Sequence, residues 1–216
     1  METYFVKDYN LPVCKYRGKM ENIKYPCYAS IKFDGELTYI INLDNECFTV
    51  NKDKYGRIRK NYPVTEEFKK LNLPKGIYLG ELFWNEGRTK EDFYGFLSHK
   101  TDDNLNLAIW GTLQLKDKID ISTEDTYNFL EKIPNQEHVI VAPYIKLYNE
   151  SELKLFAESI IDSGYEGVVI RNMDAVYRNG QSVKWTKIKK KAREIEEKTK
   201  NGAKINFKLE KYGVWL

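Results

Sequence analysis

Lysines recur at close intervals late in the chain, in the segment KWTKIKK at 184–190. In an extended strand, side chains two residues apart point to the same face, so Lys187 and Lys189 would share a face with Trp185. Two ammonium groups on one face can bind a single phosphate through charge-assisted hydrogen bonds. The pattern therefore predicts a phosphate site on this strand, although a run of charge is more often a solvated surface.

A second reactive pattern stands earlier, in the tetrapeptide Lys32-Phe33-Asp34-Gly35 between two expected strands. A K-x-D-G pattern arises by chance in about one chain in twenty of this length. A surface lysine before an Asp-Gly turn would also produce it. The other segments in the chain make it informative. In order, they are Leu79-Gly80-Glu81-Leu82, Ala108-Ile109-Trp110, Glu166-Gly167-Val168-Val169-Ile170-Arg171 and the lysine strand at 184–189.

Together these five segments resemble the motif set of the covalent nucleotidyltransferases, which comprise DNA ligases, RNA ligases and mRNA-capping guanylyltransferases. The resemblance covers about residues 29–190. The stretch at 166–189 is most similar to short bacteriophage and viral ATP-dependent DNA ligases, which carry an E-G-[VL]-[MV]-[LI]-[RK] strand, a D-x-x-Y loop and a K-x-K strand. The resemblance implies an α+β fold, with two antiparallel β-sheets flanked by helices in a ligase adenylation domain.

The resemblance also implies catalytic roles for four residues. Lys32 would be the nucleophile that attacks the α-phosphate of ATP and leaves a lysyl-AMP intermediate, with Asp34 helping to orient it. The attack needs a neutral amine, which the nearby cations Lys187 and Lys189 would favour. The same two lysines would neutralise the charge that develops on the phosphate in the transition state.

The remaining nucleotide contacts and the metal site follow from the same resemblance. Glu81 would bind the ribose hydroxyls and Trp110 would stack on the adenine, although a strand tryptophan is about as often a plain core residue. Ile31, next to the nucleophile, belongs to the expected ATP-binding residues. Glu166 would hold the divalent metal, Mg²⁺ or Mn²⁺, with Glu81 as a second expected ligand.

Positive charge gathers in two segments that could contact nucleic acid. Residues 184–193 carry six basic side chains and no acid, and residues 52–60 carry five basic side chains and one acid. We expect nicked duplex DNA, or RNA, to bind there through its phosphates, with an affinity that falls as salt rises. The candidate contacts are Lys52, Arg57, Lys184, Lys190 and Lys191.

Several positions depart from the DNA ligase pattern and leave alternatives open. Leu37 stands where many DNA ligases have arginine, Ser30 where an adenine-selecting glutamate is common, and Lys52 where arginine would grip a phosphate with two bonds. An RNA ligase and a non-catalytic module that binds nucleic acid therefore remain alternatives. Too few residues follow Lys191 for the C-terminal OB barrel of most DNA ligases. We therefore expect either the catalytic domain of a longer ligase or a minimal enzyme.

Both strands and helices must position these residues. β-Branched and aromatic residues predict strands at 28–33, 37–42, 47–50, 77–84, 167–171 and 182–188, with a hairpin turn at 42–46. A capping box predicts a helix that begins at Thr89, and apolar residues from Leu153 to Ile161 predict one buried helical face that ends at Gly164. We expect a single domain over 1–216, with a charged helix at about 190–200 inside a basic tail at 190–216.

Composition sets the class of protein. The chain has 216 residues, a net charge of +3, 42% hydrophobic and 14% aromatic residues, which exclude a disordered chain. Apolar runs are too short for a membrane span, and the N-terminus lacks a signal-peptide core. Three cysteines without a CxxC pair argue against a disulfide framework or a zinc site. The sequence therefore favours a cytoplasmic monomer, or a viral protein in a host cytoplasm, that contacts no membrane.

Overall fold

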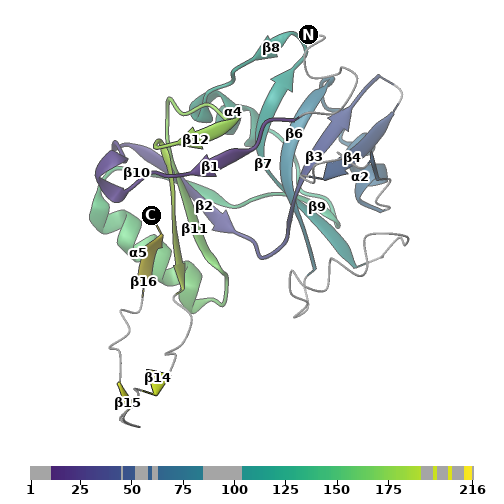
Figure 1. Ribbon diagram of the computed structural model, residues 1–216. Coiled ribbons are helices and arrows are strands. Elements are labelled where there is room, and N and C mark those ends of the chain that lie inside the picture. The colour runs from purple at the N-terminus through teal and green to yellow at the C-terminus, as the bar shows by residue number, and fades with distance from the viewer. Residues whose placement is uncertain are drawn as a thin grey trace.

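The computed structural model describes the backbone of residues 11–44, 46–51, 58–59, 63–84, 104–190, 197–198, 204–205 and 212–215, and side chains within 11–44, 46–50, 63–84 and 104–189. Two β-sheets with helices on their outer faces form the main body (Figure 1). This confirms the α+β class expected from the sequence. The helix expected from Thr89 lies outside the described residues.

The larger sheet has seven strands. Six follow the order β5-β4-β3-β6-β7-β8, and β9 pairs with β7. Its members are β3 (Glu36–Asn42), β4 (Cys47–Asn51), β5 (Ile58–Arg59), β6 (Gly76–Trp84), β7 (Leu105–Leu115), β8 (Lys118–Ile119) and β9 (Val139–Val141). The expected hairpin forms between β3 and β4, with Asn42 opposite Cys47.

The smaller sheet carries most of the chemistry-bearing segments. Its strand order is β10-β2-β11-β13-β16, and all four pairings are antiparallel. Its members are β10 (Tyr144–Leu147), β2 (Cys27–Lys32), β11 (Gly167–Asn172), β13 (Trp185–Lys190) and β16 (Tyr212–Trp215). Two pairings elsewhere are parallel, β7 with β9, and β1 (Cys14–Tyr16) with β12 (Gly180–Ser182).

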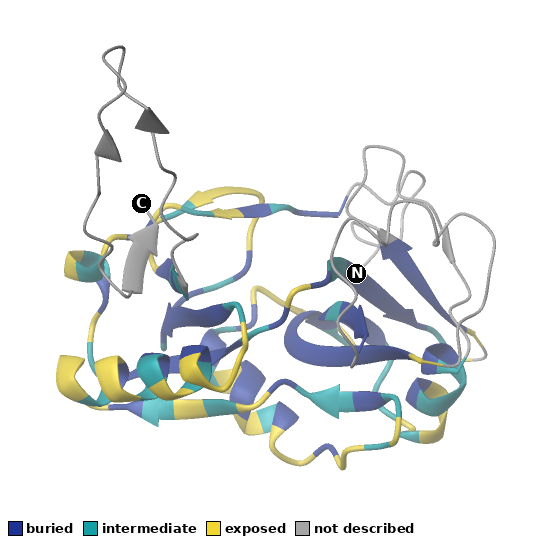
Figure 2. Cartoon of the chain, turned by 90° about the horizontal axis from the view of Figure 1, so that it is seen from below, coloured by how far each residue is buried: buried dark blue, intermediate teal, exposed yellow. Residues whose placement is uncertain are grey.

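Helix α5 (Glu150–Asp162) covers the outer face of the smaller sheet. The side-chain oxygen of Asn149 accepts the backbone N–H of Glu152 and so caps the first turn. The predicted apolar face is confirmed, because Leu153, Ala157 and Ile161 are buried against strands of this sheet. Figure 2 shows the exposed outer side of the helix and the buried layer beneath it. The opposite face of the sheet is left to line the site.

The other helices are short and pack on the larger sheet. They are α2 (Val64–Lys70) and α4 (Thr123–Leu130). The 3₁₀ turn η1 (Met20–Asn22) lies before β2 and packs with the smaller sheet, because Met20 contacts its apolar cluster. Among the described residues, no helix combines the length and the apolar character needed to cross a membrane. The three cysteines are free and buried, and burial raises the pKa of Cys27 to about 11, so its thiol stays protonated at neutral pH.

The helix expected at 190–200 is wrong where the structure describes that segment. Strand β13 continues to Lys190 and pairs with β16, and β14 (Glu197–Lys198) pairs with β15 (Lys204–Ile205). Lysine and glutamate favour helices only weakly, by a few tenths of a kcal/mol per residue. Pairing with a neighbouring strand overrides that preference here.

Candidate active site

The register of the smaller sheet brings Lys32 and Lys189 to the same rung. Lys32 is the last residue of β2, and its backbone lies opposite Gly167 at the start of β11. Gly167 in turn lies opposite Lys189 of β13. Since residues directly across an antiparallel pair share a face, both lysines flank the glycine on one side of the sheet. The residue directly before β11 is therefore placed between the side chains of Lys32 and Lys189.

Glu166 occupies that place and holds both lysines. One carboxylate oxygen accepts from the Lys32 ammonium and the other from the Lys189 ammonium. The three side chains are 21–25% exposed. Burial raises the pKa of Glu166, but the positive charges and hydrogen bonds of the two lysines outweigh burial, so that pKa lies below its ordinary value. The carboxylate is therefore ionised at neutral pH.

Glu166→Gln should remove a pH-dependent part of the stability. Because folding lowers the pKa of Glu166, its ion pairs contribute fully above the unfolded-state pKa of about 4.3. That contribution disappears as pH falls through the folded pKa. Thermal unfolding should show wild type more stable than the variant at neutral pH and equal to it in acid. Exposed Glu131→Gln is the control, and an unchanged gap at every pH would contradict the assignment.

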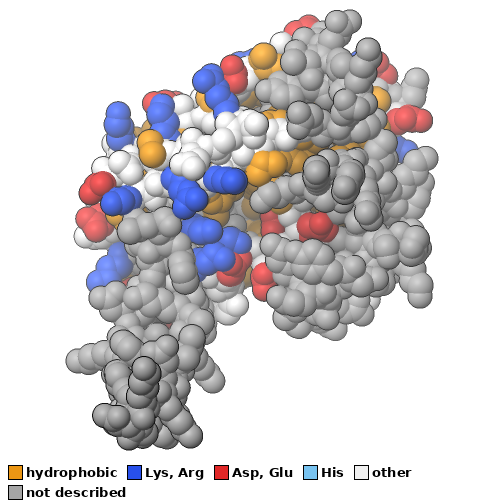
Figure 3. Space-filling model, viewed as in Figure 1, with side chains coloured by type: hydrophobic (Ala, Val, Ile, Leu, Met, Phe, Trp, Pro, Cys, Tyr) orange, Lys and Arg blue, Asp and Glu red, His pale blue; other side chains and the backbone are white. Residues whose placement is uncertain are grey.

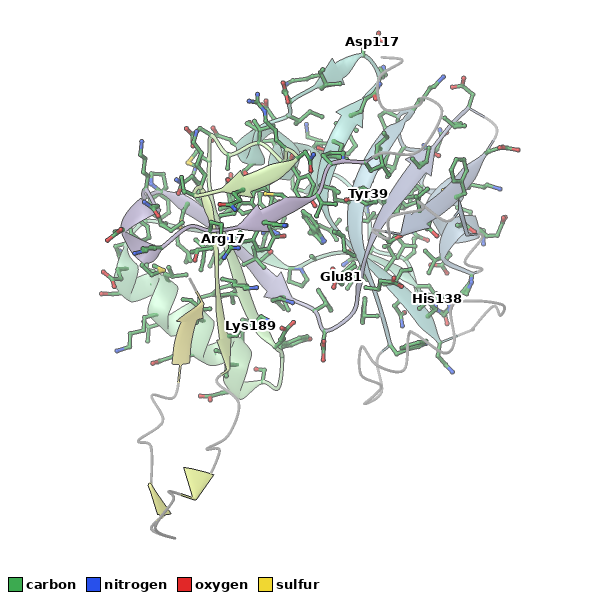
Figure 4. The ribbon with its side chains drawn as sticks, viewed as in Figure 1. Arg17, Tyr39, Glu81, Asp117, His138 and Lys189 are labelled. Carbon is green, nitrogen blue, oxygen red and sulfur yellow. The ribbon has the colours of Figure 1, made fainter. Side chains whose placement is uncertain are left out.

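The glycine of the tetrapeptide packs against the strand that carries Glu81. A Cβ on Gly35 would lie 2.1 Å from the carbonyl oxygen of Leu82 and 3.0 Å from Cγ of Glu81. Glu81 itself lies on β6 opposite Leu37 of β3 and is half-buried. The structure therefore places Glu81 beside the Lys32 tetrapeptide, on the sheet that faces Lys189 in Figure 4.

Gly35→Ala should destabilise the fold by about 2–3 kcal/mol, because the added methyl group overlaps the Leu82 carbonyl and the strands must separate. Denaturant unfolding measures the change. Gly164→Ala is the matched control, since its φ of +95° is strained but no atom lies within 4 Å of the added group. That strain alone should cost about 1 kcal/mol. A Gly35→Ala loss no larger than the control would contradict the close packing.

Asp34 and Ile31 occupy different surroundings. Asp34 is exposed and forms no ion pair or hydrogen bond with the described residues, so Glu166 is the carboxylate that contacts Lys32. Ile31 is buried in the core, and its backbone N–H donates to the carbonyl of Pro143. Lys187 is half-buried on β13, two residues from Lys189 and opposite Val169.

Trp110 is a buried strand residue in this structure. It lies on β7, is 7% exposed, and packs against Tyr177 and Trp185 with ring centroids 5.6 and 6.1 Å away. The guanidinium of Arg171 lies 5.2 Å from the Trp110 ring and 4.6 Å from the Trp185 ring. Trp185 packs in the same core as Trp110, and its strand, β13, continues to Lys187 and Lys189. Because side chains two apart in a strand share a face, the two lysines lie on the same face of β13 as Trp185, as expected from the sequence.

Arg171 is the residue that the sequence did not single out. It is 2% exposed, and it donates to the Ser30 hydroxyl at 2.6 Å and to the Tyr127 hydroxyl at 2.8 Å. Ser30 lies two residues before Lys32 on β2, so this buried cation ties the strand that ends at Lys32 to the aromatic cluster. In the sequence, Ser30 was noted only because it stands where a glutamate is common, and Arg171 only as the last residue of the segment at 166–171. Neither observation indicated that the two side chains are in contact.

The expected nucleic-acid contacts are described only in part. The ammonium of Lys184 pairs with Asp174 at 2.6 Å on the surface. Lys52, Arg57 and Lys191 lie outside the described residues, as does the side chain of Lys190. Figure 3 nevertheless shows lysine and arginine side chains gathered on the central part of this face, beside exposed hydrophobic side chains.

Three potential metal ligands converge away from Lys32. The ligating atoms of Glu67, Glu137 and His138 lie within 4.8 Å of one another. Among the described side chains, that is the one group of three or more histidine, cysteine or acidic ligands that converges so closely. Among the described side chains, Glu166 near Lys32 therefore does not converge with two further histidine, cysteine or acidic side chains. One or two carboxylates with substrate phosphates and water are nevertheless a usual Mg²⁺ environment.

Comparisons place the chain in a family. The sequence profile described as "ATP dependent DNA ligase domain" matches residues 13–189. No curated protein sequence matches. Among solved structures, the Chlorella virus DNA ligase-adenylate is similar, with 21% identity and a TM-score of 0.62 over 83% of this chain and 67% of that chain. The ATP-dependent DNA ligase of bacteriophage T7 in complex with ATP is 16% identical, with a TM-score of 0.58 over 89% and 79%.

A third similar structure is the ligase domain of M. tuberculosis LigD, which is 16% identical with a TM-score of 0.61 over 84% of this chain and 60% of that one. The chain spans only 42–64% of the first three solved ligases it matches. The profile covers the tetrapeptide, both motif glutamates and the lysine strand. By this match and by its fold, the chain belongs to the family of ATP-dependent DNA ligase domains.

Proposed function

We propose that this chain is the adenylation domain of an ATP-dependent DNA ligase and that Lys32 is its nucleophile. The observation that carries the proposal is the group of Lys32, Glu166 and Lys189, which three separate segments bring together at one end of the smaller sheet. A solvated surface lysine would not be held half-buried by a carboxylate shared with a second lysine. The family match supports ATP as the nucleotide.

The positions of these side chains support the following first step. The Lys32 ammonium first loses a proton to solvent, and the neutral amine then attacks the α-phosphorus of ATP. A P–N bond forms as a second N–H proton is lost, the bond from that phosphorus to the bridging oxygen breaks, and pyrophosphate leaves. Lys189 and Lys187 lie on the same strand face and would stabilise charge on the phosphate oxygens. Glu81, beside the tetrapeptide, is proposed to bind the ribose, and Trp110 and Ile31 to border the base.

Two further steps complete the sealing. An oxygen of the nick's 5′-phosphate attacks the same phosphorus, so AMP passes to the DNA and the Lys32 amine is released. The 3′-hydroxyl then attacks the 5′-phosphate, the new phosphodiester forms and AMP leaves. Asp34 is exposed at the rim of the tetrapeptide. We propose that it acts in these later steps or orients water, since Glu166 already contacts Lys32.

The site also fits a divalent cation, Mg²⁺ or Mn²⁺. Glu166 is an ionised carboxylate that already binds two cations, and Glu81 lies on the facing sheet. Hard oxygen ligands of this kind suit Mg²⁺. When bound, the ion would neutralise negative charge on the phosphates. Free buried thiols suit a reducing compartment, and we propose that the domain acts as a monomer in a cytoplasm.

Sealing assays test the proposal. The chain would be incubated with ATP, Mg²⁺ and a duplex that carries one nick. Three nicks would be compared: a 5′-phosphorylated DNA nick, a 5′-phosphorylated RNA nick, and a DNA nick whose 5′-phosphate already carries AMP. We expect sealed DNA product, with the pre-adenylated nick sealed fastest. Faster sealing of RNA would favour the RNA ligase alternative. A chain that bound the duplex but sealed none of the three nicks would be the non-catalytic binding module.

A further inference from the structure

Strand β1 and the three residues that follow it carry a row of cations that the basic segments of the sequence did not include. Lys15, Arg17 and Lys19 are exposed, while the residues between and beside them, Cys14, Tyr16 and Gly18, are buried or half-buried. This alternation places the three basic side chains on one outward face. Positions two apart in an extended chain are separated by about 6.6 Å, so the row spans at most about 13 Å.

The row is anchored to the strand that bears the catalytic lysines. The backbone N–H of Gly18 donates to the carbonyl of Trp185 at 2.9 Å, and the ring of Tyr16 stacks on Trp185 at 5.4 Å. A Cβ on Gly18 would lie 2.4 Å from the Val183 carbonyl, so the segments around Gly18 and Val183 are in close contact. Trp185 begins β13, which continues to Lys189. Figure 4 shows Arg17 on the same half of the molecule as Lys189.

These three side chains differ from other cations nearby in having no acidic partner among the described residues. Lys184 pairs with Asp174 at 2.6 Å and Arg178 pairs with Asp120 at 3.1 Å, both close to β12. No ion pair joins Lys15, Arg17 or Lys19 to a described carboxylate. An unpaired row of cations leaves its full charge for a polyanion.

We propose that Lys15, Arg17 and Lys19 form a phosphate-binding row that holds one strand of the nicked duplex beside the active site. The inference rests on the proposed function and names a contact surface for its substrate. A strand of duplex DNA carries one phosphate per 3.4 Å of axis, so a 13 Å row spans about four nucleotides. The contacts are to the backbone, so the row contributes affinity and register without reading sequence.

The test compares two triple variants that remove the same charge. One is Lys15→Ala/Arg17→Ala/Lys19→Ala, and its matched control is Lys70→Ala/Lys132→Ala/Lys154→Ala, at three exposed lysines on other elements. Fluorescence anisotropy with a 5′-phosphorylated nicked DNA duplex gives the affinity across about 50–200 mM salt. Each lost phosphate contact should reduce the slope of log K against log salt by about one.

We expect the row variant to lose up to about three from that slope and to bind about tenfold or more weakly, whatever the DNA sequence. The control should keep the wild-type slope. Equal slopes for the two variants would overturn the inference. So would a row variant that self-associates but binds DNA as wild type does, because the lysines would then only protect an edge strand. Arg17→Gln alone should reduce the slope by about one and covers the case of a misfolded triple variant.

Failure of this inference can be told from failure of the proposed function. Thermal unfolding of each variant confirms that it is folded. Lysyl-AMP formation by the wild-type chain is measured in parallel and does not depend on the DNA. If wild type forms lysyl-AMP and binds nicked DNA while the row variant matches the control, the proposed phosphate-binding role of the row is wrong and the proposed ligase function is retained. If wild type does neither, both proposals fail.

Discussion

Lys32→Arg is expected to abolish lysyl-AMP formation, with a loss of roughly 10⁴-fold or more. Arginine stays protonated at every accessible pH and offers no amine lone pair for attack. It also keeps a positive charge beside Glu166, so the ion pair and the fold should survive. Transfer of label from [α-³²P]ATP to the protein, followed over time, measures the rate.

Two comparisons make this result specific. Lys154→Arg, on the exposed side of α5, should label at the wild-type rate. The Lys32→Arg protein should still close a pre-adenylated nick, because that last step forms no bond to Lys32. Labelling of Lys32→Arg at the wild-type rate would place the nucleophile elsewhere, with Lys187 and Lys189 as the nearest choices on the same sheet.

Arg171→Ala is expected to be the most destabilising of the substitutions considered, at about 3–5 kcal/mol. The change leaves a cavity between Trp110 and Trp185 and removes the donor to the Ser30 and Tyr127 hydroxyls. A buried cation without a carboxylate partner is itself costly. Here two hydroxyls and two aromatic faces offset that cost, and alanine supplies none of them.

Urea unfolding at neutral pH measures the loss for Arg171→Ala. Arg178→Ala is the matched control, because that arginine is exposed and pairs with Asp120, so its removal should cost at most about 1 kcal/mol. At temperatures where Arg171→Ala is still folded, lysyl-AMP formation should also slow, since Ser30 no longer fixes the strand that ends at Lys32. A loss equal to that of Arg178→Ala would show that the buried contacts of Arg171 are not needed.

Local patterns predicted the elements that carry the site. The apolar spacing from Leu153 to Ile161 predicted α5, and the alternation at 184–190 predicted that Lys187 and Lys189 share a face with Trp185. Both signals arise within a few residues, where the helical or strand period decides which side chains are buried. The motif order then indicated the fold, and the family match confirmed it.

Contacts between distant positions could not be predicted in the same way. Glu166 was expected near a metal, but its ion pairs with Lys32 and Lys189 depend on the register of three strands. Arg171 reaches Ser30 across 141 positions of sequence, which no local pattern indicates. The expected helix at 190–200 failed for the same reason, because pairing of β13 with β16 depends on residues further along the chain.

Mass spectrometry of the intact chain tests the central claim most directly. The protein is first treated with pyrophosphate to remove any AMP carried from expression, then incubated with ATP and Mg²⁺, and finally digested to locate any adduct. We predict a gain in mass of one AMP, attached to the peptide that contains Lys32 and absent from Lys32→Ala. An adduct on another residue, or no adduct at neutral or raised pH, would contradict the assignment of Lys32 as the nucleophile.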